Sequence, residues 1–101
     1  MASGCHKKVG SFIGTGAAKD IELDFTPRYV RLVNLTDLES AEKFADSDVA
    51  TKEGGVKRVI AGTMSALTAA QGVTLGTRKF TVGTDNAVNG ANDHISFVAE
   101  E

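Results

Sequence analysis

The sequence predicts an all-β protein, a compact antiparallel β-sandwich (jelly-roll or immunoglobulin-like) of about seven to eight short strands. Three observations lead to this fold class. The 11 glycines fall between short apolar stretches, proline occurs once, and several stretches alternate apolar and polar residues. Such a pattern is typical of short strands joined by tight turns. The 101 residues are enough for one domain, which we expect over residues 9–101 after a flexible arm at residues 1–8.

The N-terminal part contains the most regular alternation. An extended stretch over residues 8–13 ends at Gly14-Thr15-Gly16, and Ile21–Phe25 then alternates apolar with acidic residues, as a half-buried strand does. Thr26-Pro27 predicts a corner, because proline lacks a ladder donor and biases the preceding residue toward extended geometry. Residues 28–35 carry apolar side chains on both faces. They predict a central strand that is covered on two sides and packs across from the strand at residues 21–25.

The middle of the chain allows two interpretations on pattern alone. Within residues 36–48, Thr36–Glu39 fits a capping box and apolar residues follow at helical spacing. The same segment also suits a charged edge strand. Gly54-Gly55 ends a polar loop, after which residues 56–61 are expected to form a strand, and residues 63–70 again mix the two signals.

The C-terminal part predicts three short strands around one turn-rich loop. The expected strands cover residues 73–75, 79–82 and 94–99. Residues 83–93 between them are rich in Gly, Asn and Asp, which tolerate the positive φ of tight turns or bond to neighbouring backbone amides. We therefore expect this loop to be ordered and compact.

Composition argues against several classes of function. The formal charge of -2 is unlike the basic excess of domains that follow nucleic-acid phosphates. No apolar run approaches the roughly 18 residues of a membrane span, and no apolar stretch of the signal-peptide kind follows the first lysines. The single Cys5 cannot form an intrachain disulfide. We expect neither a nucleic-acid nor a membrane partner.

No motif makes a strong case for chemistry. His6 and His94 are the only histidines and are best explained as surface residues. The stretch at 14–19 superficially resembles a phosphate loop, but its last position is wrong for either form, so a hairpin turn explains it better. Asp85, Asn89 and Asp93 offer oxygen ligands for calcium, although their spacing does not match a helix-loop-helix calcium site. We expect no enzyme, no cofactor, and no catalytic or metal-binding residues; a small metal-dependent hydrolase is the least favoured alternative.

Two stretches resemble segments of small virion structural proteins of tailed bacteriophages. Residues 25–37 are similar to their F-x-P-R-Y-V-x-x-x-N-L-T-D segment, and residues 80–90 to their segment with the pattern G-F-T-I-G-T-D-x-x-I/V-N-x-x-G. The resemblance covers most of residues 12–99 in the same order. The chain departs from the group at Glu42-Lys43-Phe44, where other members often carry a tryptophan or other aromatic residues. The resemblance implies strands rather than helices over Glu39–Ala45 and Val56–Leu67.

What the resemblance implies for function is a role in assembly on the virion. The first expectation is a capsid decoration (cement) protein on the outer head surface. Such a protein would be a homo-oligomer, with a trimer favoured, and would bridge the major capsid protein or other virion proteins. The alternative is a tail or fibre module that contacts the host surface or other tail proteins. The candidate contact residues lie in the arm and in the turn-rich loop; they are His6, Lys7, Lys8, Asp85, Asn86, Asn89 and Asn92.

Overall fold

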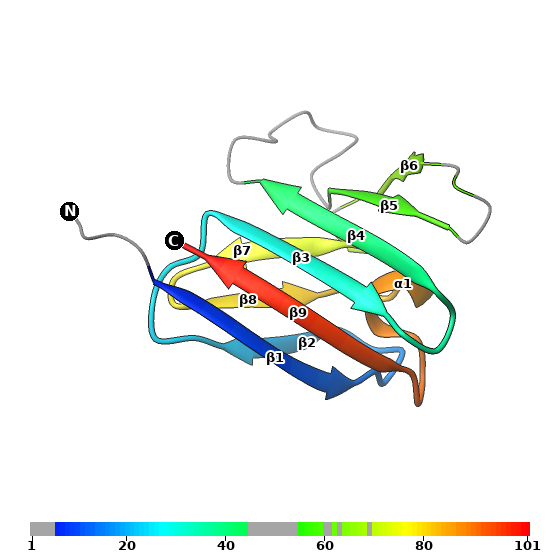
Figure 1. Cartoon of the computed structure of the whole chain (residues 1–101), viewed down its shortest axis with the longest axis horizontal. Helices are drawn as coiled ribbons and strands as arrows, with labels where there is room; N and C mark the ends of the chain where they lie inside the picture. The colour runs from blue at the N-terminus through cyan, green and yellow to red at the C-terminus, as the bar shows by residue number, and fades with distance from the viewer. Residues whose placement is uncertain (1–5, 45–54, 60–61, 63, 69) are drawn as a thin grey trace.

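The chain folds into two antiparallel β-sheets that pack face to face, as the computed structural model shows for residues 6–44, 55–59, 62, 64–68 and 70–101 (Figure 1). The large sheet contains, in spatial order, β1 (Lys7–Ile13), β9 (His94–Glu100), β3 (Tyr29–Asn34), β4 (Glu39–Phe44), β5 (Val56–Arg58) and β6 (Met64–Ala66). The small sheet contains β2 (Lys19–Glu22), β8 (Lys79–Val82) and β7 (Val73–Gly76). The predicted all-β sandwich is confirmed.

The pairing is nested, because β1 pairs with β9 and β2 pairs with β8. Strands β1 and β2 follow one another in the chain but belong to different sheets. The turn at residues 14–18 therefore carries the chain from one sheet to the other, and the hairpin turn expected there is wrong. The predicted corner at Pro27 is confirmed, since it returns the chain to the large sheet, where β3 lies between β9 and β4.

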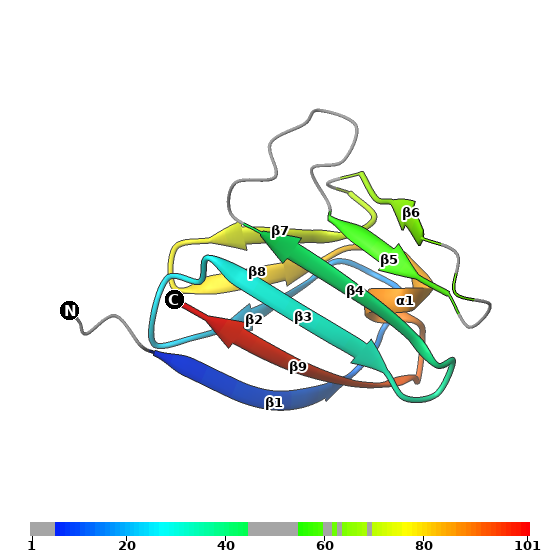
Figure 2. The same ribbon diagram turned by 45° about the horizontal axis from the view of Figure 1, so that its top comes forward.

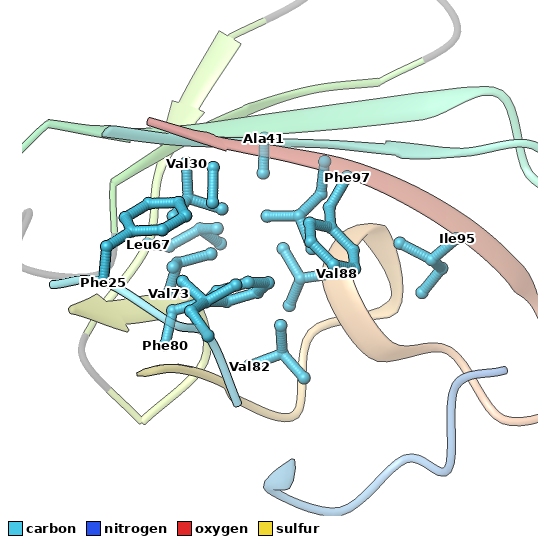
Figure 3. Close-up of a cluster of buried hydrophobic side chains, with 13 residues drawn as sticks. Phe25, Val30, Ala41, Leu67, Val73, Phe80, Val82, Val88, Ile95 and Phe97 are labelled. Atoms are coloured by element: carbon cyan, nitrogen blue, oxygen red, sulfur yellow. The ribbon is translucent and has the colours of Figure 1, made fainter. Parts of the chain in front are cut away.

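The core fills the space between the sheets, as Figure 3 shows. Strands β3, β8 and β9 contribute every second side chain to it, which is the period that the sequence displays. Phe80 of β8 meets Phe97 of β9 edge to face, with the ring centroids 5.1 Å apart. The other residues in the buried cluster are Leu23, Phe25, Val30, Leu32, Ala41, Leu67, Val73, Val82, Val88, Ile95 and Ala99. Full burial of a side chain such as Leu32 contributes about 1.5–3 kcal/mol.

Three expectations about elements are settled. The ambiguous segment after Thr36 is the strand β4, and β5 and β6 are also strands, as the resemblance implied; residues 45–54, 60–61 and 63 lie outside the described part. The turn-rich loop is ordered but contains a short helix that the sequence did not predict, α1 (Asn86–Asn89), capped by Asp85. This is the single helix in the described part, and it is far too short to cross a membrane.

Two expectations are wrong. Strand β1 begins at Lys7, so Lys7 and Lys8 belong to the sheet and not to an arm; residues 1–5 lie outside the described part. Strand β3 is central in its sheet, but one of its faces is open. Val30 and Leu32 are completely buried, whereas Arg31 is exposed and Val33 is half-buried. Within the described part of the chain, no second layer covers the apolar residues on this face of β3.

Candidate interaction face

The outer face of the large sheet is the broad surface turned away from the core, visible toward the viewer in Figure 2. Its side chains follow from the strand registers, because partners across a sheet and every second residue along a strand share one side. One row across the sheet is Val9, Val98, Arg31, Glu42, Val56 and Ala66, and the next is Ser11, Ser96, Val33, Ser40, Arg58 and Met64. At the start of β3, a third row contains Lys7, Glu100, Tyr29 and Phe44.

This outer face carries large apolar side chains that are open to solvent. Val9 is 72% exposed, Met64 55% and Phe44 53%, and Ile13 at the end of β1 is also exposed. The outer face of the small sheet is different. It presents Asp20, Glu22, Thr74, Thr81 and Lys79, and Asp20 accepts hydrogen bonds from both Thr81 (2.7 Å) and Lys79 (3.1 Å). The small sheet therefore has an ordinary solvated face, whereas the large sheet has one suited to contact with another molecule.

Arg31 lies in the middle of the outer face. It lines three shallow hollows, which lie over β3, its neighbours β9 and β4, and β5 on the far side of β4. Among the residues that the structure describes, no carboxylate lies within ion-pair distance of its guanidinium. Its cross-strand neighbour Glu42 instead accepts a hydrogen bond of 2.6 Å from the hydroxyl of Tyr29.

Tyr29 and Phe44 form a small aromatic cluster beside Arg31. Their ring centroids are 4.8 Å apart. Burial raises the pKa of the Tyr29 phenol to about 12, and the hydrogen bond to Glu42 and the charge of that carboxylate add to the shift. The protonated phenol donates its hydrogen bond to Glu42, the cross-strand neighbour of Arg31.

A groove of about 370 Å³ lies on the outer face beside the turn between β3 and β4. Its apolar lining comes from Val33, Leu38 and Val59, and its cationic lining from Arg31 and Arg58; Glu39, Ser40 and Gly62 complete it. Leu38 is 62% exposed and has a φ of +59°. This left-handed backbone costs a leucine roughly 1–2 kcal/mol, whereas glycine or asparagine adopts it readily.

The three candidate contact residues of the expected arm lie together at one end of the large sheet. His6 Nδ1 is 2.5 Å from Glu101 Oε1, and the imidazole stacks on Phe25 at 5.8 Å between centroids. Lys7 Nζ is 4.0 Å from a carboxylate oxygen of Glu100, and Lys8 is exposed. These lysines lie on the edge strand β1, where positive charge opposes unwanted pairing with other sheets.

The four candidate contact residues of the turn-rich loop do not form a common contact surface. Asn89 is completely buried, so its side chain cannot reach a partner, and that prediction is wrong. Its amide accepts from Thr15 N (2.8 Å) and donates to the carbonyl groups of Gly83 (2.8 Å) and Ala17. Asp85 caps α1 through Ala87 N and also binds Lys57 Nζ at 2.9 Å. Asn86 and Asn92 are exposed.

The oxygen-rich residues of the loop do not gather around one point. Asp85 binds Lys57, whereas Asp93 Oδ2 accepts from Asn34 Nδ2 at 2.9 Å. Hydrogen bonding of the protonated Asp37 carboxyl to Asp93 raises the pKa of Asp37, and desolvation and the negative charge of Asp93 add to this. Within the described ranges there is no group of three His, Cys, Asp or Glu residues that could hold a metal ion.

Sequence reasoning missed Arg31, Arg58 and Leu38. The signal that could have found them is the apolar residues on both faces of the strand that became β3. These residues were interpreted as a strand buried on two sides within one chain. The same pattern also arises when the second face is covered by another molecule.

Comparisons with models of protein families, with curated proteins and with solved structures find no match to this chain. The function therefore has to be inferred from the chemistry and geometry of its surfaces.

Proposed function

We propose that this protein is a bacteriophage virion structural protein, a capsid decoration protein that binds the outer head surface and stabilises contacts between capsid subunits. The observation that carries the proposal is the contrast between the two sheet faces. The small sheet has a polar outer face with an ion pair, whereas the large sheet exposes Val9, Phe44 and Met64 around a central arginine. The sequence resemblance to small virion proteins supplies the kind of partner.

The proposed mechanism is mechanical. A sandwich with two sheets joined by one core is stiff, so it transmits a load from one contact to another. The molecule extends 39 by 28 Å along its two longer axes, which accommodates a standard interface of about 800 Å² per partner. Many copies of such a contact, each bridging neighbouring capsid subunits, raise the total cost of separating those subunits.

The tail or fibre alternative relied on the turn-rich loop as a contact surface. Asn89 and Asp85 of that loop are held by partners within the chain, so the outer face of the large sheet is the better contact candidate. We further propose that the chain is a homo-oligomer, with a trimer as the form that suits a local symmetry axis of a shell.

The test is the copy number and the mechanical effect of this chain in purified particles of the phage that encodes it. We expect a copy number comparable with that of the major capsid protein, and heads that lose DNA at lower temperature when the gene is deleted. Quantitative mass spectrometry and thermal release of DNA measure the two. A copy number in the range of tail components, or absence from the particle, would contradict the proposal.

A further inference from the structure

Two guanidinium groups on the outer face of the large sheet are not neutralised by the described part of this chain. Arg31 and Arg58 both line the groove, and neither forms an ion pair with a carboxylate of the described residues. Arg58 Nη2 lies 3.5 Å from the sulfur of Met64. Of the acidic groups on the same face, Glu42 accepts a hydrogen bond from the neutral Tyr29 hydroxyl and keeps its charge, and Glu100 lies near Lys7.

Among the described side chains in the rows of this face, Lys7, Arg31 and Arg58 outnumber Glu42 and Glu100, so the face has a small surplus of positive charge, although the whole chain has a formal charge of -2. Charged groups on an interface are arranged to meet the opposite sign on the partner. Arginine is suited to this, because its planar donors match a carboxylate in a bidentate fashion and its weak hydration lowers the cost of burial. A second copy of this chain, docked face to face, would bring the same surplus of arginine and so does not fit.

Leu38 is the second observation, and it is independent of charge. An exposed leucine with positive φ loses local stability at a turn position where asparagine would be comfortable. Backbone strain of this kind occurs where the surroundings or the function require a particular side chain. Here the side chain lies in the turn between β3 and β4 and lines the groove together with Val33 and Val59.

We propose that the groove formed by Val33, Leu38 and Val59, with Arg31 and Arg58 on its lining, binds a surface of a different protein that presents a carboxylate next to an apolar side chain. The apolar side chain of the partner would fill the groove, and the carboxylate would bind an arginine. This inference deepens the proposed function and rests on it, with the capsid surface as the partner. Glu39 also lines the groove and would repel a second carboxylate placed next to it. The carboxylate of the partner must therefore bind at an arginine and not beside Glu39.

The experiment uses heads assembled from a phage genome that lacks this gene, to which purified protein is added. Binding is measured by co-sedimentation across a range of protein and salt concentrations. We expect Arg31→Glu and Arg58→Glu each to weaken binding by about thirtyfold or more, because the charge pair is lost and the partner carboxylate is left unpaired. Arg31→Lys should lose less than Arg31→Glu, since it retains the charge but not the bidentate geometry.

The matched control is Arg78→Glu. Arg78 is exposed and lies in the turn between β7 and β8, on the small sheet. The substitution therefore makes the same change of charge at a site away from the groove. We expect this variant to bind heads like the unmodified protein. Loss of binding to the same extent would mean that net charge, rather than the groove, decides association, and would overturn the inference.

Leu38→Asn separates binding from folding. Relief of the left-handed backbone should raise the melting temperature by about 4–8 °C, while removal of the apolar contact should weaken binding to the heads. If Arg31→Glu, Arg58→Glu and Leu38→Asn all bind heads as tightly as the unmodified protein does, the inference is overturned and the decoration role still stands. Unmodified protein that does not bind heads at all would overturn both.

Discussion

Tyr29 shows how one side chain organises the centre of the outer face. It is the single tyrosine of a chain without tryptophan, and its hydroxyl donates to Glu42 at 2.6 Å. The hydrogen bond occupies the carboxylate that lies across the strand pair from Arg31. Glu42 keeps its negative charge but bonds to Tyr29, and Arg31 has no ion pair with a carboxylate among the described residues.

The titration of Tyr29 is a direct test of this arrangement. Its pKa is raised to about 12 by burial first, and then by the hydrogen bond and charge of Glu42. Because the folded pKa lies above the usual value of about 10, this group stabilises the fold fully below that value and loses its contribution as pH rises toward 12. We expect Glu42→Gln to lower the pKa but to leave it above the usual value, since burial remains. Phenolate absorbance measures this without interference from tryptophan.

Glu22→Gln is the control, because Glu22 lies on the outer face of the small sheet. This substitution also removes one negative charge. It should leave the titration of Tyr29 unchanged. An equal shift in both variants would mean that the general charge of the protein, rather than the bond to Glu42, sets the pKa of the phenol.

At the scale of elements, α1 and its loop connect the two sheets. Asn89 at the end of α1 binds Thr15 N and the Ala17 carbonyl group of the turn between β1 and β2, and also the carbonyl group of Gly83. Gly14 makes this contact possible, because a side chain there would place its Cβ 2.0 Å from the carbonyl oxygen of Gly90. The loop that the sequence suggested as a contact surface thus serves to fix the crossover between the sheets.

Replacement of Asn89 tests this role. We expect Asn89→Ala to lower the free energy of unfolding by about 3 kcal/mol, because buried backbone groups lose their partners. Asn86→Ala is the control: Asn86 has an exposed side chain in the same helix, and its replacement should change stability by no more than about 0.5 kcal/mol. Urea unfolding followed by circular dichroism measures both. Similar stability of the two variants would contradict a pinning role for Asn89.

The sequence was informative about elements because alternation is a local property. The buried positions of β3 and β9 show it directly, and even the disputed segment after Thr36 is a strand. It was less informative about which Asn of a turn-rich loop points inward. Asn89 and Asn92 look equivalent in sequence, but a helical turn capped by Asp85 carries Asn89 into the interior. The nested pairing of β1 with β9 joins residues distant in the chain, and such pairing leaves no local pattern.

At the scale of the whole molecule, the two faces of the large sheet have different tasks. The inner face holds the sandwich together, and the outer face is proposed to bind a partner. Leu32 and Val33 are adjacent in β3 and point to opposite faces, with Leu32 completely buried and Val33 half-buried beside the groove. A serine substitution at each position therefore tests the two faces separately: Leu32→Ser tests the core, and Val33→Ser tests the outer face.

We expect Leu32→Ser to lower the free energy of unfolding by about 4 kcal/mol, since it leaves a cavity and buries a hydroxyl group. Val33→Ser should cost no more than about 1 kcal/mol, because its side chain is already partly in water. Urea unfolding at several protein concentrations measures both. A Val33→Ser cost that grows with protein concentration would mean that the outer face is covered by a second copy of this chain. We assigned the groove to a different protein because the arginines on its lining call for a partner with acidic groups. Coverage of the outer face by a second copy would contradict that assignment.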